Sequence, residues 1–309
     1  MKSGAIRWMG IAVVFGSLGL GWAPGAEDGN LRYSISVSKF PNEAGWSGRW
    51  DIGQGFTTIM TDALQQSGRF IVLGDAEMRQ EAMAEQDLGA TGRTAGGAKT
   101  PQVGRMTPAQ LLVRGSITHV QDDTAGGSGG IGFRGIRLGG SGAKAEVNIT
   151  IYLVDSATGQ VKASTKVVGR STQRGLRIGY SGSALGGLTG DMGGFLNDNV
   201  GKACQDAVGQ AIEFLTAQLE QVPWQGSVVL AQPNRIVINR GTREGVATGM
   251  RFKVGQSEEL VDPDTGEVLD VDFTTVGAIE VTEVREKIAY AQAVSGGDQI
   301  AKGMTVAPE

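Results

Sequence analysis

The chain has 309 residues and a formal net charge of −4, with 40% hydrophobic and 19% charged residues. This composition excludes a wholly disordered chain, and the acidic balance argues against a nucleic-acid-binding surface. The length favours two domains. One cysteine, Cys204, excludes a disulfide framework, and one histidine, His119, leaves little scope for zinc or histidine-driven catalysis. The unusual feature is glycine: 50 residues, about twice the usual share.

Residues 1–26 are typical of a secretory signal peptide. Two basic residues precede an apolar stretch at 8–22, and small residues follow at 23–26. The alternative is an uncleaved membrane anchor, but this run is interrupted by glycines and is short against the roughly 20 apolar residues that span a bilayer. We therefore expect an exported protein whose mature chain starts near residue 27.

The next part of the chain alternates strand and helix patterns, which favours an α/β domain. Apolar residues recur at helical spacing from Phe56 to Leu64, and Gly68 supplies a helix C-cap. In chain order we expect a strand at 31–40, a loop at 41–55, a helix at 56–67, a strand at 70–73, a helix at 75–87, a glycine-rich loop at 89–105, a short helix starting at 107–110 and a strand at 111–120.

Residues 145–154 alternate apolar and polar side chains and predict a half-buried strand. The turn at Asp155–Gly159 and the alternation at 161–167 predict a hairpin. From Leu196 an apolar stripe predicts a long helix that Pro223 ends.

After Trp224 the pattern changes to short strands, which indicates a small barrel or sandwich. The domain boundary is placed at 222–225. Gly249–Phe252 and Gly303–Val306 suggest one structural device used twice. The expected strands lie at 226–230, 235–239, 251–254, 277–284 and 288–294, with an acidic turn at 262–266.

No motif supports catalysis. Gly130–Gly135 matches a dinucleotide-binding pattern, but the glycine-rich sequence after it cannot sustain the helix that this site needs. Gly126–Gly130 matches a hydrolase elbow, but His119 precedes it and is expected to be a partly buried structural residue in a strand. Cys204 is expected to be a small buried hydrophobe. We predict no catalytic residue, no cofactor and no metal site.

The glycine-rich stretches at 125–142 and 179–194 leave two interpretations open. They are either two flexible surface loops or two hairpins that join neighbouring subunits as strands of an oligomeric barrel. A membrane strand needs about 9–11 alternating residues.

The order of these pieces resembles the curli-secretion channel family, CsgG-like, over about residues 31–220. The motifs that carry the resemblance are Ser67-Gly68-Arg69-Phe70, Gly115-Ser116-Ile117-Thr118 and Val154-Asp155-Ser156-Ala157-Thr158-Gly159. The C-terminal part is similar to the terminal domain of the flagellar assembly protein FlgT. That similarity rests on Val237–Gly241, Gly249–Phe252, Asp262–Leu269 and Gly303–Val306.

The resemblance implies a homo-oligomeric ring in the outer membrane of a Gram-negative bacterium that exports unfolded polypeptide. Each subunit would donate two β-hairpins, near 125–154 and 167–195, to one large barrel. The loop at 41–55 would form the channel constriction, with the candidates Asn42, Trp46, Trp50 and Phe56 facing the channel. Trp46 and Trp50 are equally consistent with packing on the body of the domain.

We therefore expect an α/β (α+β) periplasmic domain with β-hairpin extensions, followed by a small all-β barrel-like domain. The signal peptide would occupy 1–26, the CsgG-like domain 27–222 and the FlgT-like domain 224–309. The leading hypothesis is a non-enzymatic secretion channel or assembly component of the periplasm or outer membrane, with no nucleic-acid partner. The alternative is a soluble periplasmic scaffold that binds partners around a flagellar motor or envelope complex.

Overall fold

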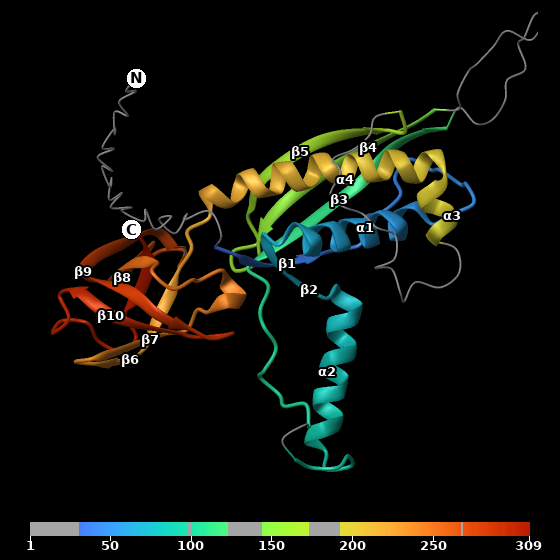
Figure 1. The fold of residues 1–309 in the computed structure, drawn as a ribbon. Coiled ribbons are helices and arrows are strands. Elements are labelled where there is room, and N and C mark those ends of the chain that lie inside the picture. The colour runs from blue at the N-terminus through green and yellow to red at the C-terminus, as the bar shows by residue number, and fades with distance from the viewer. Residues whose placement is uncertain (1–30, 98–99, 123–143, 173–191, 267) are drawn as a thin grey trace, which may run out of the picture.

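The structure is a computed structural model that describes residues 31–97, 100–122, 144–172, 192–266 and 268–309. The expected signal peptide, both glycine motifs at 126–135 and most of the two glycine-rich stretches lie outside the described residues. The described chain forms a five-stranded sheet with helices, followed by a closed β-barrel (Figure 1). The expected fold class, a mixed α and β domain followed by a small barrel, is confirmed.

The five-stranded sheet has the strand order β2-β1-β3-β4-β5. β1 runs parallel to β2 and β3, whereas β3, β4 and β5 pair antiparallel. Alternate residues of β4 are buried, as the period-2 pattern predicts. The strands are β1 Tyr33–Val37, β2 Phe70–Leu73, β3 Leu111–Asp122, β4 Ala145–Asp155 and β5 Val161–Arg170.

Two helices pack on this sheet, α1 Ile52–Ser67 and α4 Asn199–Gln218, and the short helix α3 Met192–Asn197 packs on α4. α4 contacts β4 and β5, and α1 contacts β1, β2 and α4 (Figure 1). The α1 helix begins four residues before its apolar pattern because Asp51 caps it, accepting a hydrogen bond from Gln54 N at 3.0 Å. Gly68 closes α1 with a left-handed φ of 65°, as expected.

The predicted short helix at 107–110 is wrong. These residues are irregular because Gln110 bonds to β1 instead of to a helical turn: its backbone N–H donates to the Ser34 carbonyl, and its side-chain oxygen accepts from Ser34 N, each at 3.0 Å. The predicted long helix from Leu196 is divided at Asp198, which caps α4 by accepting from Val200 N.

The α2 helix, Ala76–Ala90, projects away from the rest of the domain (Figure 1). None of its residues is buried. Met78, Met83 and Leu88 are all exposed. Within the part of the chain that the structure describes, no helix combines the length and the apolarity needed to cross a membrane.

The barrel closes in the order β10-β7-β6-β11-β8-β9. Its last strand, β11, pairs with both β6 and β8. β8 and β9 are longer than the sequence pattern predicts because their paired ends form an exposed ribbon that lacks a buried face. The strands are β6 Gly226–Gln232, β7 Arg235–Ile238, β8 Arg251–Val261, β9 Val268–Val284, β10 Ala289–Ser295 and β11 Thr305–Pro308, with short 3₁₀ turns η2 Leu219–Gln221 and η3 Thr242–Glu244.

The barrel contains the same tight turn twice. Met250 N donates to the Ala247 carbonyl at 3.2 Å, and Met304 N donates to the Ala301 carbonyl at 3.3 Å. In each turn the methionine sulfur accepts from the alanine N–H at 3.3 Å. A glycine with φ near 90° precedes each methionine. The expected repeated device is therefore confirmed.

Candidate functional site

The loop between β1 and α1, residues 41–51, is attached to β3 at its first half. Asn42 forms an isolated parallel bridge with Ile117. The Ile117 carbonyl accepts hydrogen bonds from Glu43 N and Ala44 N, each at 2.9 Å, and Ile117 N donates to the Pro41 carbonyl at 3.0 Å. The pairing of β3 with β4 shifts its register just after Ile117. The start of the loop is therefore held by the body of the sheet.

Asn42 and Trp46 lie together in this loop. The Asn42 side-chain amide donates to the Trp46 carbonyl at 2.7 Å. The Trp46 indole lies over Gly48, where an added Cβ would come within 1.9 Å of the ring. Asn42 is exposed and Trp46 is half-buried. Glycine at position 48 thus allows the Trp46 ring to fold back over the loop.

Trp50 anchors the other end of the loop on the α3–α4 junction. Its ring meets that of Phe195 edge-on at 6.4 Å, and its Nε1–H lies 3.5 Å from Asp198 Oδ2. The Arg49 guanidinium lies over the same indole at 4.7 Å. An added Cβ at Gly194 would lie 2.6 Å from the Trp50 ring. The sequence offered no signal for these partners, which come from the other end of the domain.

Phe56 is fully buried, with its ring 4.7 Å from that of Phe40. The structure therefore brings Asn42 and Trp46 together, places Trp50 against α3 and puts Phe56 in the core. Asn42 is the most exposed of the four and Phe56 the least.

Three strand ends meet at one end of the five-stranded sheet. Asp122, the last residue of β3, pairs with Ala145, the first of β4, and Glu146 pairs with Arg170, the last of β5. Arg170 also forms an ion pair with Glu146 at 3.0 Å, and its backbone N–H donates to Asp206 of α4. The described strand ends that precede the two glycine-rich segments, those of β3 and β5, therefore lie at the same end of the sheet.

The described parts of the two expected hairpins belong to the body of the domain. Residues 145–154 lie in β4, 167–170 in β5 and 192–195 in α3. The remainder, 125–143 and 173–191, lies outside the described residues.

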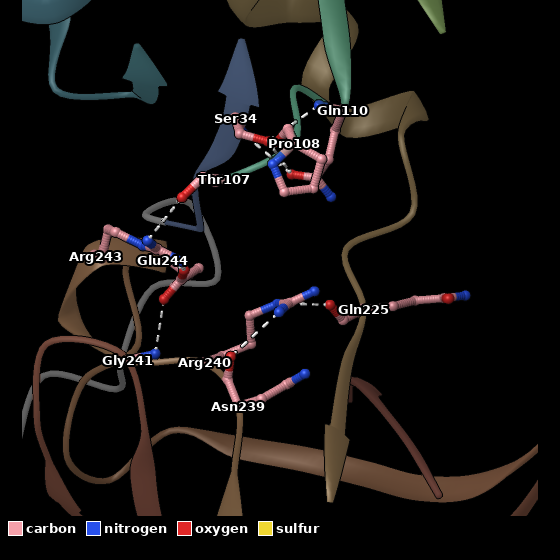
Figure 2. A network of polar contacts seen from close by, with 10 residues as sticks. All are labelled: Ser34, Thr107, Pro108, Gln110, Gln225, Asn239, Arg240, Gly241, Arg243 and Glu244. Carbon is pink, nitrogen blue, oxygen red and sulfur yellow. Dashed lines mark hydrogen bonds and ion pairs between the residues drawn. The ribbon is translucent and has the colours of Figure 1, made fainter. Parts of the chain in front are cut away.

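The barrel is joined to the α/β domain by hydrogen bonds as well as by the chain. Tyr33 OH donates to the Val222 carbonyl at 2.6 Å, and Arg32 N donates to the Glu244 carbonyl at 2.9 Å. Trp224 stacks on Phe252 of the barrel at 5.2 Å. Figure 2 shows the polar network beside these contacts, in which Arg243, paired with Glu244, reaches Thr107 of the α/β domain.

Cys204 and His119, the two residues singled out in the sequence, lie in different environments. Cys204 is fully buried on α4, and burial raises the pKa of its thiol, as expected of a structural cysteine. The expectation that His119 is partly buried is wrong: it lies in β3 with its side chain exposed. Among the described residues, no three histidine, cysteine or acidic side chains lie close enough to hold a metal ion.

Comparison with known protein families gives one match, which covers more than half of the chain. Residues 25–241 match the family of the curli production assembly/transport component CsgG. The chain belongs to the CsgG family. This confirms the resemblance read from the sequence for the first domain, whereas the FlgT-like character of residues 224–309 stays a prediction. No curated protein matches the chain.

Several solved structures are similar to this CsgG-family chain at low identity. The PelC dodecamer from Paraburkholderia phytofirmans is 12% identical over 58% of this chain and 85% of its own, with a TM-score of 0.31. The hypothetical protein CT253 from Chlamydia trachomatis is 9% identical over 60% and 96%, with a TM-score of 0.33. The LpoB C-terminal domain from Escherichia coli is 18% identical over 47% and 87%, with a TM-score of 0.27.

Proposed function

We propose that this CsgG-family chain is a non-enzymatic protein of the cell envelope that assembles into a homo-oligomeric ring and acts as a secretion channel or an assembly component for surface structures. The observation that carries the proposal is the family match together with the position, at one end of the sheet, of the two strand ends that precede the glycine-rich segments. Residues 1–26 would direct export to the periplasm, and the ring would act there or in the outer membrane.

The positions of the flanking strands support two hairpins from each subunit. The segments 123–143 and 173–191 each hold about 20 residues, which is enough for two membrane strands of about 9–11 residues. Because β3 and β5 end on either side of the start of β4, two hairpins that begin there would be neighbours in one wall. The hairpins of all subunits in the ring would then complete one closed barrel. A closed barrel has no exposed strand edge.

We propose that the loop at 41–51 narrows the lumen of this ring. Asn42 and Trp46 would face the channel, whereas Trp50 and Phe56 would hold the loop against the domain. An unfolded polypeptide would pass the aromatic constriction passively, without nucleotide hydrolysis. The attachment of the loop to Ile117 supports a constriction that keeps its shape.

The ring hypothesis is tested by shortening one segment at its paired ends. Asp122 and Ala145 are register partners, so residues 123–144 can be replaced by the turn Asn-Gly, which favours a two-residue hairpin. We expect this variant to keep the far-ultraviolet circular dichroism of the α/β domain. It should lose the detergent-stable oligomer of the outer-membrane fraction. An oligomer of unchanged size in that fraction would contradict the proposal.

The constriction is tested by the conductance of the purified oligomer in planar bilayers. Replacing Trp46 with Ala removes a half-buried ring from the loop, and we expect a larger single-channel conductance. Phe273→Ala is the matched control, because it removes a half-buried ring from β9 of the barrel, outside this loop, and should leave the conductance unchanged. Equal conductance of wild type and Trp46→Ala would show that Trp46 does not line the lumen.

A periplasmic scaffold is the second candidate function, and the unburied α2 helix favours it. No residue of α2 is buried, so most of the surface of this helix is available for a partner. Cell fractionation separates the two functions. Recovery in the periplasm without detergent supports the scaffold, and recovery as heat-resistant oligomers in the outer membrane supports the channel.

A further inference from the structure

A crevice of about 160 Å³ lies where the barrel meets the α/β domain. The α/β domain lines it with Arg32 from the start of the described chain and Thr107 from the segment before β3. The barrel side contributes Arg240, Arg243 and Glu244, and the linker contributes Trp224. Figure 2 shows Arg243 beside Thr107 and Arg240 beside Gln225. The crevice therefore draws its lining from both domains.

The lining carries more positive than negative charge. Arg243 is neutralised by Glu244, since its Nη2 lies 2.6 Å from Glu244 Oε1. The other oxygen of this carboxylate accepts from Gly241 N at 2.9 Å. Glu244 is 5% exposed and is the one acidic side chain among the described residues that line the crevice.

The other two arginines form no ion pair among the described residues. Arg240 donates through Nε to the Gln225 carbonyl at 2.8 Å and through Nη1 to the Asn239 carbonyl at 3.2 Å (Figure 2). Both acceptors are neutral, and Glu244, which also attracts Arg240 electrostatically, is already paired with Arg243. One carboxylate therefore serves two arginines, and the lining keeps a positive excess. The Nε of Arg32 is buried and has no hydrogen-bond partner in the described part of the chain.

A third donor lies at the same place. The Nε1 of Trp224 is also buried and without an acceptor among the described residues, and Trp224 as a whole is only 5% exposed. A buried donor that makes no hydrogen bond destabilises the folded state, and a buried charge without a full counter-charge destabilises it more. A negatively charged ligand that accepts hydrogen bonds would remove both destabilising effects.

We propose that this crevice is the binding site of a small oxyanion of the phosphate class. The guanidinium fork matches tetrahedral and planar oxyanions better than a point charge does. The volume is large enough for one phosphate group. Because Arg32 belongs to one domain and Arg240 to the other, the bound anion ties the barrel to the α/β domain.

The test uses the mature full-length protein and inorganic phosphate, titrated calorimetrically at constant ionic strength with chloride as the reference anion. We expect saturable phosphate binding by the wild type. Arg32→Gln should weaken it at least tenfold, and its Nε makes no described bond that the substitution would break. Arg114→Gln removes the same charge from an exposed position on β3 and should bind phosphate as the wild type does.

A second measurement separates a loss of phosphate binding from a loss of global stability in the variant. Hydrogen exchange of the linker at 222–225 should slow when phosphate is added to the wild type and should not change in Arg32→Gln. Arg32→Lys keeps the charge without the fork and should bind with intermediate affinity.

Three results would overturn the proposal. One is no phosphate binding by the wild type up to millimolar concentration, and another is equal binding by Arg32→Gln and Arg114→Gln. The third is binding of phosphatidylglycerol vesicles through Arg32 without any binding of inorganic phosphate. That result would assign the crevice to a lipid headgroup instead of free phosphate.

Discussion

At Gly169 the backbone of β5 lies so close to α4 that no side chain fits between them. An added Cβ would come within 1.9 Å of the Ala203 carbonyl oxygen and 2.8 Å of Ala207 N. Both atoms belong to the backbone of a helix, which cannot move away as a flexible side chain could. The contact fixes how closely α4 packs on the sheet.

We expect Gly169→Ala to lower the free energy of unfolding by about 1–3 kcal/mol, the usual cost of forcing extra atoms into a packed interior. Urea denaturation followed by circular dichroism measures this change. Gly96→Ala is the matched control, since nothing lies within 4 Å of an added Cβ there. Equal midpoints for the two variants would show that α4 can shift without cost.

Glycines also show which residue-scale features the sequence could predict. Gly68 was predictable because a helix pattern ended beside it, and it adopts the left-handed cap. Gly115, within one of the family motifs, has a packing role that no local pattern reveals: an added Cβ would lie 2.1 Å from the Thr150 carbonyl oxygen and 2.5 Å from Phe40. A reason that depends on residues 35 and 75 positions away cannot be read from neighbouring residues.

Among the elements, the ribbon formed by the outer ends of β8 and β9 places like charges face to face. Glu258 lies directly opposite Asp272 in the antiparallel register, and both are exposed. Opposed like charges destabilise a strand pair, whereas opposite charges stabilise it by about 0.2–1 kcal/mol.

Glu258→Lys should therefore slow the hydrogen exchange of the ribbon amides, with a gain in protection of about twofold to fivefold that shrinks as salt is added. The control is Glu213→Lys, which makes the same charge change on an exposed position of α4. Glu258→Gln should fall between wild type and Glu258→Lys. Faster exchange in Glu258→Lys would mean that the carboxylates do not repel each other in this register.

Most elements followed from local patterns, and the exceptions have long-range causes. The alternation at 145–154 predicted β4 because one face of that strand is buried and the other is not. The helix expected at 107–110 failed because Gln110 bonds to Ser34, which lies 76 residues earlier. In the candidate loop, the backbone hydrogen bonds between Ile117 and the residues from Pro41 to Ala44 likewise could not be predicted. Such bonds join main-chain atoms and do not depend on the identity of the side chains.

On the scale of the whole molecule, Tyr33 is one of the groups that join the two domains. Its hydroxyl donates to the Val222 carbonyl at 2.6 Å, and the side chain is 5% exposed. Burial raises its pKa from 10.0 to about 12, because the phenolate would lose its hydration. Below pH 10 the group is protonated in the folded and unfolded chain alike, so its contribution to stability is complete there. As the pH rises from 10 to about 12, the unfolded chain loses this proton first and the folded state loses stability.

Tyr33→Phe should lower the free energy of unfolding by about 1 kcal/mol at pH 7, because the hydrogen bond is lost. The same variant should lose less stability than wild type between pH 10 and 12. Urea denaturation at a series of pH values measures both effects. Tyr152→Phe, at an exposed position, should show the same dependence of unfolding free energy on pH as the wild type. If Tyr33→Phe also lost as much stability as the wild type between pH 10 and 12, the raised pKa of Tyr33 would not contribute to that loss.

The position of β11 has a consequence for the order in which the chain acquires its structure. The five strands and the helices of the first domain all precede residue 219, whereas the barrel is completed by Thr305–Pro308 between β6 and β8. During synthesis and export from the N-terminus, β6 and β8 are made many residues before the strand that bridges them. Until that strand arrives, both expose unpaired backbone edges that are prone to association with other chains. A chaperone that shields the growing chain is needed most in this interval, when the first domain can already be folded.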